Sequence, residues 1–187
     1  MRALLACTAL LLLVPAPSMA ATDLQLPPFS AIDAHGGAHV TLHHGDRQRV
    51  TVIKGDMSIS RITVVNGTLM VENCVNSCWF GNHELDVDVV APNVQALAAH
   101  GGGDIEAVGP FPRQSHLAVA AHGGGEINAR AIPADSVSAD AHGGGDIKVN
   151  ALVSLAASAH GGGDITYTGN PAKVASSTHG GGSIQHE

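Results

Sequence analysis

Histidine is the residue type whose number and spacing first indicate chemistry in this chain. There are 12 histidines among 187 residues. Five of them begin the same motif, His-Gly-Gly-Gly, which continues with Asp, Glu or Ser and then Ile. Neutral imidazole is a ligand for Zn²⁺, Cu²⁺ and Ni²⁺. The candidate metal ligands are therefore His100, His122, His142, His160 and His179.

Two interpretations of these histidines stay open. If successive copies stack at the inter-strand spacing of about 4.8 Å, neighbouring rings form a ladder that binds Zn, Cu or Ni. Alternatively, each histidine caps its glycine-rich turn, and duplication of one ancestral unit has copied it. The acids four residues after each histidine would form a parallel acidic column, which consists of Asp104, Glu126, Asp146 and Asp164.

The repeat also predicts the elements that position these side chains. Its copies lie 18 to 22 residues apart, and a degenerate copy places His35 about three periods before His100. Repeats of this length are typical of solenoids, and the alternating apolar residues indicate short strands without helices. The sequence therefore predicts an all-β fold, a β-helix with rungs of 18–22 residues. Its inward column would consist of Ile105, Ile127, Ile147 and Ile165.

The first half of the chain shows the same alternation between turn residues. Turns are expected at Gly45-Asp46, Gly55-Asp56, Asn66-Gly67, Pro92-Asn93 and, in the second half, Asn170-Pro171. The strands expected between the earlier turns are Ala38–Leu42, Arg49–Ile53, Ser60–Val65, Thr68–Glu72 and Glu84–Val90.

The N-terminus has the pattern of a secretory signal peptide. Arg2 precedes the apolar run Ala3–Val14, and small residues follow, so cleavage is expected after Ala20, with Ala21 as the second choice. The predicted organisation is a signal peptide over 1–20, a short lead over 21–28 and one domain over 29–187. The mature chain is expected to be exported to the periplasm or the cell surface and not to span a membrane.

Charge and missing motifs argue against two classes of function, nucleic-acid binding and catalysis. A formal net charge of −7 argues against a nucleic-acid partner, because no Lys/Arg excess neutralises phosphates. Neither GxSxG nor HExxH occurs in the chain, so the sequence predicts that the protein is not an enzyme. A glycan-acting enzyme is the enzyme class kept as an alternative, although aromatic residues make up only 3%.

The chain from about Phe29 to Ile184 resembles the family described as "putative auto-transporter adhesin, head GIN domain". The resemblance rests on the opening Phe29-Ser-Ala-Ile-Asp, a following Val-Thr-Leu stretch and the repeated Gly-Gly-Asp-Ile turns. It implies a right-handed β-helix in a bacterial envelope or secreted protein, and it implies no established activity. This chain differs by having His where the family commonly has Ser or another small residue.

These observations together predict an exported β-helical structural or interaction module of adhesin type. The alternatives are a transition-metal binder that uses the histidine ladder and a glycan-acting β-helix enzyme. The expected partner is a protein or glycan surface, and the last rung, Ser183–Glu187, offers an unpaired edge for self-association.

Two cysteines remain once the predicted leader is removed, Cys74 and Cys78. An even number in an exported protein favours a disulfide between them. The alternative is a thiolate metal site completed by His83. The adjacent Trp79 and Phe80 form a candidate contact patch.

The disulfide can be tested directly. Protein purified from an oxidising compartment should show no free thiol by thiol titration under native, metal-free conditions, because Cys74 and Cys78 are joined. Two titratable thiols would contradict this prediction and favour the thiolate site with His83.

Overall fold

The computed structural model describes residues 21–75 and 83–187. The predicted signal peptide, residues 1–20, and the residues Cys78, Trp79 and Phe80 lie outside these ranges. In the described part all regular structure is β, and no helical segment there has the length and apolar character needed to cross a membrane. The strands are β1 (Thr22–Leu24), β2 (Ala31–His35), β3 (Ala38–His44), β4 (Arg49–Lys54), β5 (Arg61–Val65), β6 (Thr68–Glu72), β7 (Leu85–Ala91), β8 (Ala96–His100), β9 (Asp104–Val108), β10 (Gln114–Gly123), β11 (Glu126–Gly143), β12 (Asp146–Gly161), β13 (Ile165–Thr168), β14 (Lys173–Gly180) and β15 (Ile184–His186).

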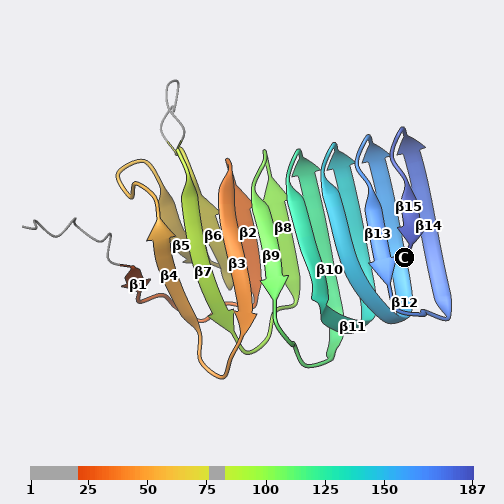
Figure 1. Cartoon of the computed structure of the whole chain (residues 1–187), viewed down its shortest axis with the longest axis horizontal. Helices are drawn as coiled ribbons and strands as arrows, with labels where there is room; N and C mark the ends of the chain where they lie inside the picture. Colours follow the sequence, from red (N-terminus) through yellow and green to blue (C-terminus); the bar gives the residue numbers. More distant parts are fainter. Residues whose placement is uncertain (1–20, 76–82) are drawn as a thin grey trace, which may run out of the picture.

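The strands form one mixed sheet that curls on itself (Figure 1). Its path runs β1-β4-β7-β3-β9-β11 and returns through β10-β8-β2-β6-β5, and β12 to β15 extend it beyond β11. The long strands β11 and β12 each contribute to both layers. β11 pairs with β9 in one layer and with β10 in the other, and β12 pairs in the same way with β13 and β14. The sheet therefore has two layers that face each other.

The expectation of a right-handed β-helix is wrong. The sheet contains antiparallel pairs, β1 with β4, β4 with β7 and β5 with β6, beside its parallel pairs. His35 pairs directly with His100, so the 64 residues between them do not form three intervening rungs. Instead, they leave the repeat to form β3 to β7, and the two left-handed residues Asn66 and Gly67, with φ of 51° and 77°, turn β5 back onto β6.

Other expectations are confirmed. Strands cover each of the five ranges predicted in the first half to within one or two residues, and the predicted turns fall between strands. The lead over 21–28 contains a strand, β1, which pairs with β4. In the second half, the predicted isoleucine column exists: Ile105, Ile127, Ile147 and Ile165 are in register on neighbouring strands, and each is at most 1% exposed.

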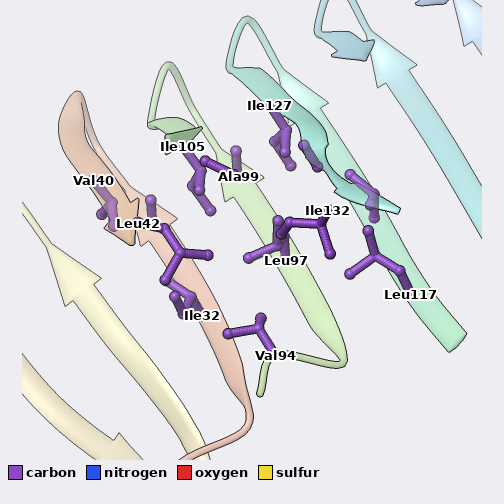
Figure 2. Close-up of a cluster of buried hydrophobic side chains, with 14 of the residues drawn as sticks. Ile32, Val40, Leu42, Val94, Leu97, Ala99, Ile105, Leu117, Ile127 and Ile132 are labelled. Carbon is purple, nitrogen blue, oxygen red and sulfur yellow. The ribbon is translucent and has the colours of Figure 1, made fainter. Parts of the chain in front are cut away.

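The core lies between the two layers of the curled sheet (Figure 2). Val40 of β3, Ile105 of β9 and Ile127 of β11 contribute from one layer, while Ile32 of β2 and Leu97 of β8 contribute from the other. The strands alternate buried and partly exposed residues, as in β2 and β8, where the second and fourth residues of each strand are buried. The other side chains of each strand therefore lie on the outer surface of the sheet, where they can contact other molecules.

The glycine triplet allows successive copies to approach closely. Its first glycine takes a positive φ, for example 92° at Gly123 and Gly143 and 103° at Gly161, which a side chain would make unfavourable. Its third glycine lies against the preceding copy, because a Cβ on Gly125 would collide with the backbone oxygen of Gly103. Gly124, in the middle of the same triplet, faces open space.

This difference predicts unequal effects of one added methyl group. The substitution Gly125→Ala should lower the free energy of unfolding by roughly 1–3 kcal/mol, because the backbone of two strands must separate. The matched control Gly124→Ala should change it by less than about 1 kcal/mol. Urea unfolding followed by circular dichroism measures both. Equal losses would contradict the close approach described for Gly125.

Candidate functional site

The histidines of the repeat form a continuous column on the outside of one layer. Because β2, β8, β10, β11, β12 and β14 pair in parallel, the histidine of each copy is the register partner of the next. Neighbouring imidazole centroids are 4.6 to 5.1 Å apart, and neighbouring ring planes differ by 2° to 13°. The histidine column consists of His35, His100, His122, His142, His160 and His179.

The five histidines predicted as metal ligands are thus brought together, but as stacked rings. The lone pair of an imidazole nitrogen lies in the ring plane, so the lone pairs of parallel rings point the same way and do not converge on one ion. Two nitrogens on one tetrahedral metal ion would be about 3.3 Å apart, which is closer than the rings of the column. A metal ladder along the whole column stays a prediction.

The residue two positions before a column histidine lies on the same outward side of the strand, and in three copies it contacts the imidazole. Oγ of Ser158 is 2.9 Å from Nε2 of His160, and Oγ of Ser177 is 3.4 Å from Nδ1 of His179. In β2 this position is Asp33, whose Oδ1 is 2.9 Å from Nε2 of His35. The strand therefore supplies an oxygen beside the ring in these copies.

Asp33 also reaches the next histidine along the column. Its Oδ1 is 3.5 Å from Nε2 of His100. Partial burial lowers the pKa of His100, and the neighbouring imidazoles of His35 and His122 act in the same direction, while the Asp33 carboxylate opposes them. The end of the column at β2 therefore differs electrostatically from the rest, because only there is a carboxylate in contact with two imidazoles of the described chain.

The strip beside the column carries short side chains. The outward positions two and four residues before the histidines hold only Ala, Ser and Asp. A shallow depression of about 260 Å³ lies over the later copies. This strip leaves the edges of the rings accessible. It consists of Ala31, Asp33, Ala96, Ala98, Ala118, Ala120, Ser138, Asp140, Ala156, Ser158, Ala175 and Ser177.

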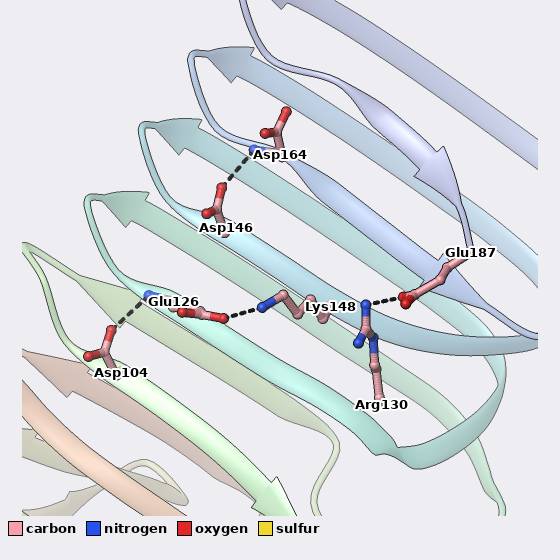
Figure 3. A network of polar contacts seen from close by, with 7 residues as sticks. All are labelled: Asp104, Glu126, Arg130, Asp146, Lys148, Asp164 and Glu187. Atoms are coloured by element: carbon pink, nitrogen blue, oxygen red, sulfur yellow. Dashed lines mark hydrogen bonds and ion pairs between the residues drawn. The ribbon is translucent and has the colours of Figure 1, made fainter.

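The predicted acidic column lies on the other layer, in register along β9, β11 and β12 and at the residue before β13 (Figure 3). Its carboxylates hold the next copy: Oδ1 of Asp104 accepts the backbone N–H of Glu126 at 2.9 Å, and Oδ1 of Asp146 accepts that of Asp164 at 3.1 Å. Oδ1 of Asp164 accepts both the backbone N–H and the hydroxyl of Ser183, each at 2.7 Å. Three of the four acids, Asp104, Asp146 and Asp164, therefore cap the turn of the next copy.

Long charged side chains on this layer pair with one another. Lys148 pairs with Glu126, and Arg130 pairs with Glu187 (Figure 3). A partner that docked on this layer would first have to break or desolvate these ion pairs, which costs free energy.

A cavity of about 460 Å³ is lined in part by Lys54, Asp56, His83 and Glu84. A glycan-hydrolysing site needs one carboxyl group that keeps its proton. Here Lys54 holds the pKa of Glu84 below its usual value through a hydrogen bond and its charge, and hydrogen bonds from Ser58 lower the pKa of Asp56. Both groups stay ionised near neutral pH, so this cavity gives no support to the enzyme alternative.

Sequence reasoning missed Asp33 and included His35 only as a degenerate copy. The available signal was the spacing Asp33-Ala-His35 on a predicted strand, which places both side chains on one side. Cys74 takes a positive φ of 61° and is disulfide-bonded. Its predicted partner Cys78 lies outside the described residues, so the pairing stays a prediction.

A family model and several solved structures match this chain. The model of the family described as "putative auto-transporter adhesin, head GIN domain" matches residues 28–115 and 112–171. The chain belongs to this family, which confirms the resemblance found in its sequence.

Solved structures share the fold. A putative adhesin from Bacteroides fragilis is 18% identical, with a TM-score of 0.54, over 89% of this chain and 96% of that one. A protein described as a putative lipid binding protein, from Parabacteroides distasonis, is 16% identical, with a TM-score of 0.50 over the same shares. No curated protein matches the chain.

The turn caps yield a prediction for Asp104. The substitution Asp104→Ala should lower the free energy of unfolding by about 1 kcal/mol, because the N–H of Glu126 loses its acceptor. Asp104→Asn should retain most of the stability, since its amide oxygen can accept the same hydrogen bond. Glu106→Ala, an exposed position on the same strand, is the control for urea unfolding. Equal stability of the Ala and Asn variants of Asp104 would contradict the cap.

Proposed function

We propose that this protein is an exported interaction module of adhesin type, and that it binds an extended glycan chain along the histidine column. The observation that supports the proposal is the unbroken stack of imidazoles across β2, β8, β10, β11, β12 and β14. Each neutral imidazole has one nitrogen that donates and one that accepts a hydrogen bond. The column therefore offers a linear series of polar groups to the hydroxyls of a glycan.

The stack also lowers the entropic cost of binding. An imidazole that packs between two others has lost much of its rotational freedom before a ligand arrives, so less is lost on association. The short side chains of the adjoining strip let a polymer approach the rings. Protein interfaces usually depend on large aromatic or aliphatic anchors, and the strip of Ala, Ser and Asp offers none, so the imidazoles are the groups that would hold a partner on this layer.

Export is the part of this proposal that rests on the family and the N-terminal sequence. An adhesin acts outside the cytoplasm, and the signal-peptide pattern over 1–20 agrees with that location. We propose no catalytic role. Self-association is not needed for the glycan interaction, because all six imidazoles belong to one chain.

The experiment measures the binding of labelled protein to immobilised polysaccharides, neutral and acidic, and to immobilised extracellular proteins. A triple variant, His122→Asn, His142→Asn and His160→Asn, should bind its polysaccharide at least about tenfold more weakly, because three adjacent hydrogen-bonding rings are lost. The matched control changes the other layer, with Glu106→Gln, Thr166→Asn and Gln185→Asn, and should bind as the wild type does.

Circular dichroism and thermal unfolding establish that both triple variants are folded. Saturable binding to proteins alone would overturn the glycan assignment. An absence of saturable binding to any immobilised surface would contradict the function, and equal affinity of the two triple variants would contradict the assignment to the histidine column.

A further inference from the structure

One end of the histidine column differs from the rest in the groups that meet there. Asp33 and His35 lie two residues apart on β2, and His100 lies beside His35 on the neighbouring strand β8. Oδ1 of Asp33 is 2.9 Å from Nε2 of His35 and 3.5 Å from Nε2 of His100. One ligand atom from each of the three residues lies within 4.8 Å of the other two.

From this geometry we infer that Asp33, His35 and His100 bind one divalent transition-metal ion. Two imidazole nitrogens and one carboxylate oxygen are suitable ligands for Zn²⁺, Cu²⁺ or Ni²⁺. Ligand atoms on one tetrahedral Zn²⁺ are about 3.3 Å apart, and the two distances from Asp33 lie on either side of that value. The two rings must also turn out of their parallel stack, so that the lone pairs of both Nε2 atoms point to one position.

The rings of this pair already depart most from the parallel stack. His35 and His100 have the shortest centroid distance in the column, 4.6 Å, and the largest angle between planes, 13°. The other pairs are 4.8 to 5.1 Å apart with angles of 2° to 11°.

The ligand atoms are also left without other partners. Oδ1 of Asp33 and Nε2 of His35 are buried and make no hydrogen bond of acceptable geometry in the described chain, although they are close together. A buried polar atom without a hydrogen bond costs free energy. A metal ion would use both lone pairs at once and offset that cost.

The site remains open to solvent. The side chains of Asp33, His35 and His100 are 17%, 33% and 36% exposed, so the three residues lie at the surface, where water can complete the coordination of an ion. Three protein ligands with an open position are typical of exchangeable or catalytic metal sites, whereas structural zinc sites have four. The ion would join β2 to β8 although 60 residues lie between their nearest ends in the sequence.

The register offers a natural control within the same column. Asp140 occupies on β11 the position that Asp33 occupies on β2, two residues before a column histidine. Among the described residues, the ion pairs between a carboxylate and a column imidazole all involve Asp33 and none involves Asp140. The inferred site therefore needs Asp33 in particular and not simply an acid beside the column.

The test is titration of the chelator-treated protein with ZnCl₂ by calorimetry, with Co²⁺ as a second probe whose visible spectrum reports coordination. The wild type should bind one ion through these residues. Asp33→Asn and His100→Gln should each weaken binding at least about tenfold. Asp140→Asn and His179→Gln should bind as the wild type does. Asp33→Ser, which copies the residue found at position 158, replaces Asp33→Asn if that variant does not fold.

The outcomes separate this site from general binding by histidines. A selective effect of Asp33 and His100, with a changed Co²⁺ spectrum, supports the inference. Equal weakening by all four substitutions would overturn it in favour of a ladder along the whole column, and unchanged binding in the Asp33 variants or no binding by the wild type would also overturn it. Glycan binding is measured separately on metal-free protein, so this site and the proposed function can fail independently.

Discussion

Parallel, in-register pairing between successive copies of one short motif is the constraint on which this structure depends. Backbone hydrogen bonds between neighbouring strands fix both the spacing and the register. Whatever residue stands at one position of the motif is therefore placed beside the same residue of the next copy. Isoleucine at one position becomes a buried column, and histidine at another becomes a stack of exposed rings. Core and surface are thus two consequences of the same pairing.

The remaining parts of the motif make this pairing possible. Glycine at the third position of each triplet removes the Cβ that would separate two turns, and the following acid accepts an N–H from the next copy. The acids of the motif lie on one layer and its histidines lie on the other, so the two layers differ in the groups that they offer to other molecules. The layer with the acidic column uses its charges as caps and ion pairs, whereas the layer with the histidine column presents a stack of partly exposed imidazoles beside short side chains. The second layer is therefore the better candidate for contact with other molecules.

The sequence predicted the strands, the turns and the isoleucine column because alternation and glycine are local signals. It did not predict the sheet, because pairing between distant segments has no local signal. The spacing between His35 and His100 is compatible with three hidden rungs, yet the chain makes them direct neighbours and places antiparallel strands on the other side. For the same reason, the sequence identified the histidines of the repeat but not Asp33, whose contact with His100 exists only once β2 lies beside β8.

The pairing of His35 with His100 is also where the account is most open to measurement. Nuclear Overhauser spectra of protein with labelled histidine rings should show a cross-peak between these two imidazoles, because their centroids are 4.6 Å apart. The same spectra should connect each later ring to its neighbour in the order His100, His122, His142, His160 and His179. A cross-peak from His35 to His100 confirms the column as the product of in-register pairing. Connections among the later five rings without any contact to His35 would contradict it, since β2 would then lie elsewhere in the sheet.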